Sequence, residues 1–135
     1  MTRSQQLMQT AERLVREVHD AHTGSENEVR KTYGGLCHEF PVMVRTCGLC
    51  QAVAFSLDKA GNNDKPREKA HELLLRHVAC ILGVERNGLG EHIQELSTVD
   101  YMLATRKIVS AWLFFKRFAV SILKVKDARP AKEGG

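Results

Sequence analysis

The sequence predicts an all-α protein, a single compact bundle of about five to six helices joined by short loops. Three observations lead to this prediction. Apolar residues recur at spacings of three and four through most of the 135 residues, which is the period of one face of an α-helix. No segment shows the alternating pattern of a half-buried strand. The length and a hydrophobic share of 43% allow one core but leave little room for a second domain.

The first half of the chain contains three amphipathic segments. The first carries its apolar stripe at Leu7, Ala11, Leu14 and Val18. Thr23-Gly24-Ser25 is expected to end that helix and to start the next one. A second stripe begins at Val29, and Pro41 lies within it, so we expect a kink or a fresh start there. Gly48 is expected to weaken the helix locally or to let another backbone come close, before the pattern continues to about Asp58.

The segment 59–65 is the clearest loop, since it is rich in Gly, Asn and Asp. Pro66 is well placed to open the following helix, because a first helical residue needs no amide donor. Gly83 is expected to end that helix. After a turn, residues 89–96 form a short helical piece.

The longest predicted helix covers about residues 98–124, and Ser97 is its expected N-cap. Most of the aromatic residues lie in this helix, so we expect it to form the spine of the core. The sequence thus divides into a helical bundle domain at residues 1–124 and a flexible tail at residues 125–135, which has no periodicity.

A line of cations follows the outward side of the last helix. At about 100° per residue, Arg106, Arg117 and Lys124 fall on one line, opposite the apolar stripe, and span about 27 Å. Branched apolar residues adjoin that line: Val109, Leu113 and Val120. Two interpretations stay open. These apolar residues are scattered surface positions, or the face meets a partner subunit, an RNA strand or both.

Charge and cysteine content point to an intracellular protein. Lys and Arg number 20 and Asp and Glu 16, which gives a formal net charge of +4 and a pI near 9.0. This balance permits an acidic partner such as nucleic acid. No apolar run is long enough to span a membrane, and residues 1–6 open no apolar signal region. We therefore expect a cytoplasmic protein that contacts no membrane and keeps its four cysteines reduced.

The residues that could carry chemistry give little support to catalysis. Cys47 and Cys50 form a CxxC pair, to which Cys37 and His38 could add two ligands for zinc; a redox pair and plain buried thiols are the alternatives. His71 and His77 are six residues apart, about 240° around a helix, so they cannot chelate one ion. No phosphate-binding loop and no nucleophile motif is present. We expect no catalytic residues, no metal and no cofactor.

The central part of the chain carries a more specific pattern. It reads Tyr33-Gly-Gly-Leu36, then Glu39-Phe40-Pro41-Val42-Met43-Val44-Arg45, then Gly48-Leu49-Cys50-Gln51-Ala52-Val53-Ala54-Phe55. This string resembles the signature of the small α-helical subunit, the fifth subunit, of the type III-B CRISPR Cmr RNA-silencing effector complex. The likeness extends over nearly all of the chain. Both cysteines of the CxxC pair are departures from the family pattern.

The resemblance implies a non-catalytic subunit in antiviral defence. Such a subunit stacks beside larger backbone subunits along the guide–target RNA duplex and binds the RNA backbone without reading its sequence. The implied partners are other Cmr subunits, copies of the same chain, the CRISPR guide RNA and the target RNA. The residues expected to contact RNA are Arg45, Arg106, Arg117 and Lys124, followed by Arg16 and Lys107. Arg45 is included because it lies within the recognised segment.

Two other functions remain open at this point. One is a helical protein–protein adaptor without direct RNA contact, in which the basic face meets acidic subunits. The other is a small metal or thiol enzyme that uses Cys37, Cys47 and Cys50.

Overall fold

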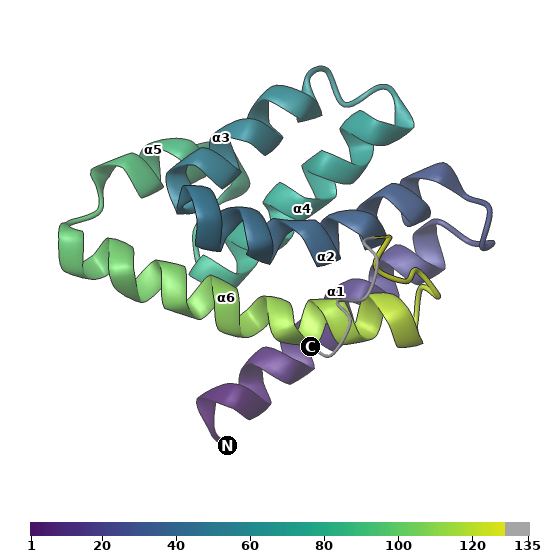
Figure 1. Cartoon of the computed structure of the whole chain (residues 1–135), viewed down its shortest axis with the longest axis horizontal. Coiled ribbons are helices and arrows are strands. Elements are labelled where there is room, and N and C mark those ends of the chain that lie inside the picture. Colours follow the sequence, from purple (N-terminus) through teal and green to yellow (C-terminus); the bar gives the residue numbers. More distant parts are fainter. Residues whose placement is uncertain (129–135) are drawn as a thin grey trace.

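The all-α prediction is confirmed. A computed structural model describes residues 1–128, and all regular elements of this range are helices (Figure 1). These are α1 (Arg3–Ala21), α2 (Glu28–Cys47), α3 (Leu49–Ala60), α4 (Pro66–Leu82), the 3-10 turn η1 (Arg86–Gly88), α5 (Leu89–Glu95) and α6 (Thr98–Ser121). Pro66 opens α4 and Gly83 ends it, as predicted, and the Ser97 hydroxyl accepts a hydrogen bond from the Asp100 amide at the start of α6. Within this range no helix is both long and apolar enough to cross a bilayer.

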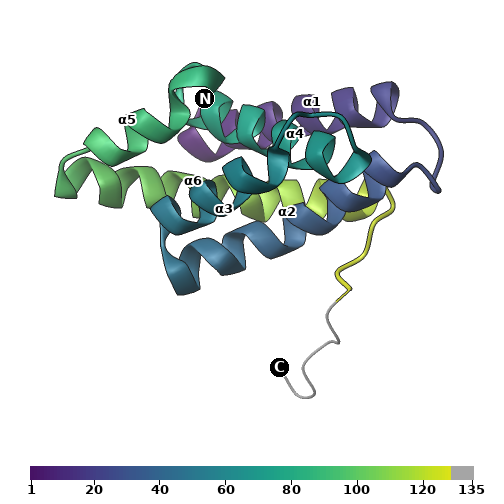
Figure 2. The ribbon, with the colours of Figure 1, turned by 90° about the horizontal axis from the view of Figure 1, so that it is seen from above.

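The long helix α6 runs along one side of the bundle. It packs against α1, α2 and α4, while α2 also packs against α3 and α4 (Figures 1 and 2). On its inward side Trp112 and Phe115 are fully buried, and their rings stack with centroids 4.2 Å apart. Phe40 of α2 lies 5.1 Å from Trp112, and His77 of α4 stacks on Phe115 at 5.9 Å. These four residues, called the aromatic cluster below, join α2, α4 and α6. Helix α6 thus supplies large core side chains, while α2 and α4 contribute more buried residues.

Pro41 does not start a new helix. Helix α2 continues unbroken through it from Glu28 to Cys47, so the fresh start that the sequence allowed does not occur. Both Phe40 and Pro41 are buried in the core. Tertiary packing of this face therefore outweighs the single backbone hydrogen bond that proline removes.

The break comes instead at Gly48, which ends α2 and begins α3. Its φ of 91° and ψ of 160° lie in a region that side-chain-bearing residues rarely adopt. Gly48 has no side chain to cap α3, and the hydroxyl of Tyr101 on α6 takes that role by accepting the Cys50 amide at 2.9 Å. A Cβ atom at Gly48 would lie 3.5 Å from this hydroxyl oxygen. Of the two effects expected at Gly48, the helix is interrupted there, and the group that lies near it is a side chain and not another backbone.

Helix α6 ends at Ser121, three residues before the predicted end. The amides of Ile122 and Leu123 both bond to the Phe118 carbonyl, and Lys124 adopts a left-handed conformation with a φ of 63°. The predicted helix ran too far because the apolar period continues through Leu123, which is buried after the helix has ended. Lys124 consequently leaves the helical line that it was predicted to share with Arg106 and Arg117.

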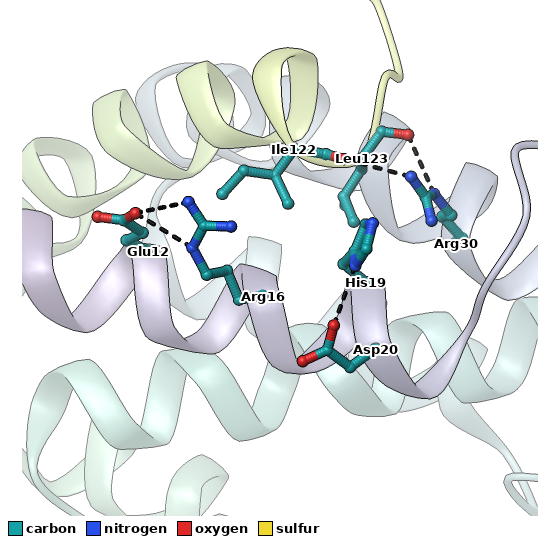
Figure 3. A network of polar contacts seen from close by, with 7 residues as sticks. All are labelled: Glu12, Arg16, His19, Asp20, Arg30, Ile122 and Leu123. Atoms are coloured by element: carbon teal, nitrogen blue, oxygen red, sulfur yellow. Dashed lines mark hydrogen bonds and ion pairs between the residues drawn. The ribbon is translucent and has the colours of Figure 1, made fainter.

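One stripe of α2 holds the chain that follows α6. The buried guanidinium of Arg30 donates to the Leu123 carbonyl at 3.0 Å and to the Ile122 carbonyl at 3.2 Å, so a cation satisfies the free acceptors at the helix end (Figure 3). One turn further on, Gly34 leaves room for Val125. After another turn, the Nε2 atom of His38 lies 2.9 Å from the Val125 carbonyl oxygen.

The predicted tail at residues 125–135 thus begins in contact with the bundle. Val125 is half-buried, and its amide donates to the Ala119 carbonyl at 2.9 Å. Residues 129–135 of that tail lie outside the described range.

Substitution by alanine should have opposite effects on stability at the two adjacent glycines of α2, Gly34 and Gly35. A Cβ at Gly34 would lie 2.5 Å from the Val125 Cβ, whereas nothing lies within 4 Å of a Cβ at Gly35. We expect Gly34→Ala to lower the free energy of unfolding by about 1–3 kcal/mol through overpacking. Gly35→Ala should raise it by about 0.5–1 kcal/mol, because alanine favours the helix. Urea denaturation of both variants measures this difference, and shifts of the same sign would contradict the packing described for Val125.

Candidate functional site

The outward side of α6 combines two arginines with exposed apolar residues. Arg106 and Arg117 are both exposed, lie about 16 Å apart along the helix, and make no ion pair within residues 1–128. Large exposed apolar side chains share this side of the helix: Val99, Met102, Leu103, Leu113 and Val120. We call these seven residues the α6 face. Leu103 and Leu113 are more than half exposed, at 54% and 52%. Val109, which was predicted to adjoin the cations, is half-buried and packs against the core.

The six predicted RNA-contact residues do not form one patch. Arg106, Lys107 and Arg117 lie together on α6. Arg45 is exposed in the last turn of α2, close to the Gly48 junction and hence near the first turn of α6. Lys124 follows the last turn of α6, at the opposite end of that helix.

Arg16 is a weaker candidate, because its charge is already compensated. Its Nε and Nη2 atoms donate to one carboxylate oxygen of Glu12 at 3.1 and 2.9 Å (Figure 3). Arg13 and Glu17 form a similar exposed pair on the same helix at 3.3 Å. Pairs of this kind stabilise a helix by only about 0.3–0.5 kcal/mol. This part of α1 is therefore an ordinary solvated surface whose charges neutralise one another.

The structure also brings a cation to α6 that the sequence analysis missed. Arg3, in the first turn of α1, lines a cavity of about 490 Å³ together with Arg106 and Lys107. Asp100 adds one negative charge to the same lining. No sequence signal pointed to Arg3, because its place depends on how α1 packs across α6.

The cysteines do not gather into one site. Cys37 is fully buried, and burial raises the pKa of its thiol to about 12. Cys47, Cys50 and Cys80 are exposed free thiols. Among residues 1–128, no group of three or more His, Cys, Asp or Glu side chains is arranged to hold a metal ion.

Two buried histidines act as neutral core residues. His77 shares a hydrogen bond with the Tyr33 hydroxyl, and His71 shares one with the Ser56 hydroxyl at 3.2 Å. Desolvation lowers the pKa of His77 to about 3 and that of His71 to about 4, with further contributions from nearby cations. Desolvation also raises the pKa of the Tyr33 hydroxyl well above its usual value. All three groups are therefore uncharged at neutral pH.

Comparison with known proteins gives a consistent result. Residues 3–122 match a family described as "CRISPR-associated protein (Cas_Cmr5)". The "CRISPR system Cmr subunit Cmr5" of Thermus thermophilus is 34% identical over 124 residues, which are 91% of this chain and 97% of that protein. The crystal structure of a CRISPR-associated Cmr5 family protein from the same organism superposes with a TM-score of 0.71 at 35% identity. That match covers 90% of this chain and 98% of the solved one.

Because His71 and His77 are buried as neutral rings, we expect the folded protein to lose stability in mild acid. Below the unfolded-state pKa of about 6.5, the unfolded chain binds protons that folded His77 takes up only near pH 3. The free energy of unfolding should therefore fall as the pH drops below 6.5, by about 1.4 kcal/mol per pH unit from His77. His71 acts in the same direction down to about pH 4. Urea titrations at a series of pH values from about 7 down to about 5 should give a smaller slope of stability against pH for His77→Gln. An unchanged slope would contradict a neutral, buried His77.

Proposed function

Because the chain belongs to the Cmr5 family of CRISPR-associated proteins, we propose that it is a non-catalytic small subunit of a type III-B Cmr ribonucleoprotein. In this role it acts as a scaffold in antiviral RNA silencing in the cytoplasm. It lies along the guide–target RNA duplex and contacts the RNA backbone without reading its sequence.

The observation that carries the RNA contact is the unpaired state of Arg106 and Arg117. Both guanidinium groups are exposed on one side of α6, and no carboxylate within residues 1–128 neutralises them. A guanidinium group binds phosphate oxygens through two parallel hydrogen bonds. Lys107 and Arg3 extend the positive region to one side of Arg106, Arg3 with a second guanidinium group and Lys107 with the point charge of an ammonium group.

The apolar residues of the α6 face support protein partners as well. Leu113 and Val120 flank Arg117 and are 52% and 42% exposed, and such apolar surface fits a protein partner better than it fits phosphates. Other Cmr subunits and further copies of this chain are the proposed partners. Stacking of copies needs two different patches on each chain, since a repeated head-to-tail contact does not close on itself.

The same apolar residues support a second candidate function, a helical adaptor that binds only proteins. In this alternative Arg106 and Arg117 meet carboxylates of a neighbouring subunit. RNA affinity then belongs to the assembly, and the isolated chain has none.

Charge reversal on α6 separates the two functions. We expect Arg106→Glu/Arg117→Glu to weaken binding of guide–target RNA duplex and to reduce the dependence of log K on log salt by about 2, because about two phosphate contacts are lost. Helicity measured by circular dichroism should not change, since both side chains are exposed. Fluorescence anisotropy across a salt series, on the isolated chain and on the assembled complex, measures the effect.

The matched control is Arg13→Glu/Arg76→Glu, which changes the net charge equally at arginines that pair with Glu17 and Glu72. An equal loss in the control would mean that net charge alone matters. Unaltered affinity of the α6 variant at low salt, in both preparations, would remove Arg106 and Arg117 from the site and favour the adaptor.

A further inference from the structure

A second surface lies on α2, α3 and α4, away from the α6 face. These three helices enclose a groove of about 400 Å³, and all of its lining residues come from them. The lining includes Thr32, Gly35, Glu39, Phe55 and Arg67. Gly35, Glu39 and Phe55 belong to the central string of the sequence, to which the RNA contacts on α6 give no role. The volume is that of a site for a single small ligand or one nucleotide.

Gly35 leaves the floor of this groove bare. It lies in the middle of α2, where glycine is less favourable than alanine, and a Cβ there would meet no atom within 4 Å. Gly34 is explained by Val125, but no contact within residues 1–128 explains Gly35. A bare backbone beside open space allows a molecule from outside to approach closely.

Phe55 forms one wall of the groove and is the most exposed aromatic residue of the chain. Its side chain is 41% exposed, whereas the other seven aromatic residues are buried or half-buried. The Nζ atom of Lys59 lies 5.4 Å from the centre of the Phe55 ring. Unpaired nucleobases stack on exposed aromatic rings, and Lys59 occupies one of the two faces of this ring.

The charges around the ring suit a nucleotide. Arg67 lines the groove, is exposed, and makes no ion pair within the described range. Lys59 lies beside the Phe55 ring and Arg67 lines the groove, so two cations adjoin this site. Glu39 and Thr32 supply oxygen atoms on α2 that can accept hydrogen bonds from the amino group of a base.

We propose that this groove binds one unpaired nucleobase of RNA, stacked on Phe55, with its phosphates near Lys59 and Arg67 and its amino group near Glu39. This inference rests on the proposed function only in supposing that RNA passes this subunit. The groove differs from the α6 contacts in how its binding responds to salt. Stacking on an aromatic ring depends little on salt, whereas phosphate contacts depend on it strongly.

The test compares Phe55→Leu with the wild-type chain in binding a short single-stranded RNA, measured by fluorescence anisotropy on the isolated full chain. Leucine keeps apolar volume but loses the ring, so we expect the affinity to fall at least about fivefold with an unchanged salt dependence. Phe55→Tyr should bind like the wild type. The control is Leu57→Ala, since Leu57 lies on the same helix with a similar exposure of 37% and does not line the groove.

A second readout uses Phe55→Trp, whose added fluorescence should be quenched when single-stranded RNA binds, beyond any change from the buried Trp112. Wild-type affinity of Phe55→Leu overturns the proposal. If that variant also fails to join the Cmr complex, the groove is a protein-docking site.

The two proposals can fail separately. Variants of Arg106 and Arg117 change the salt dependence, and Phe55→Leu does not. A wild-type chain that binds no single-stranded RNA at low salt overturns the nucleobase proposal, while the α6 contacts are still judged on the assembled complex.

Discussion

The burial of the aromatic cluster is the constraint on which the other features depend. Trp112 and Phe115 stack at 4.2 Å on one side of α6 and receive Phe40 from α2 and His77 from α4. A helix whose largest side chains are fixed inward has no freedom to rotate about its axis. The stack thereby sets which residues of α6 face water, and it keeps His77 in a place where only the neutral ring is stable.

Much of this arrangement could be predicted from the sequence, because it follows from periodicity and from helix-end signals. The helix order, the start of α4 at Pro66 and the start of α6 after Ser97 are all local features. The end of α6 was not predictable in this way, since Leu123 continues the apolar period although the helix has stopped. Just beyond the helix end, Arg30 binds the Ile122 and Leu123 carbonyls, and this contact spans 93 positions of the chain, so no local signal reveals it.

Only the part of the candidate site that lies on one helix could be predicted from the sequence. Arg106 and Arg117 share a helix face, and spacing alone places them together. Arg3 joins them only because α1 crosses α6, and a single sequence carries no signal for that contact. The groove was also hidden, since Gly35 and Gly34 look alike in the sequence and differ only in what lies beside them. The molecule thus has two unlike surfaces, one on α6 with two arginines that are unpaired within the described part of the chain and one groove lined by an exposed aromatic ring.

The junction at Gly48 leaves no linker between α2 and α3. One residue both ends the first helix and begins the second, so a single pair of backbone dihedral angles fixes the angle between them. Phe55 lies about 10 Å along α3 from this pivot, which makes the helix a short lever. A rotation of about 10° at Gly48 would carry the ring about 2 Å across the groove. The backbone angles of Gly48, a residue outside the groove, thus contribute to where the Phe55 ring lies, and the Tyr101 hydroxyl binds the first turn of α3 beside this pivot.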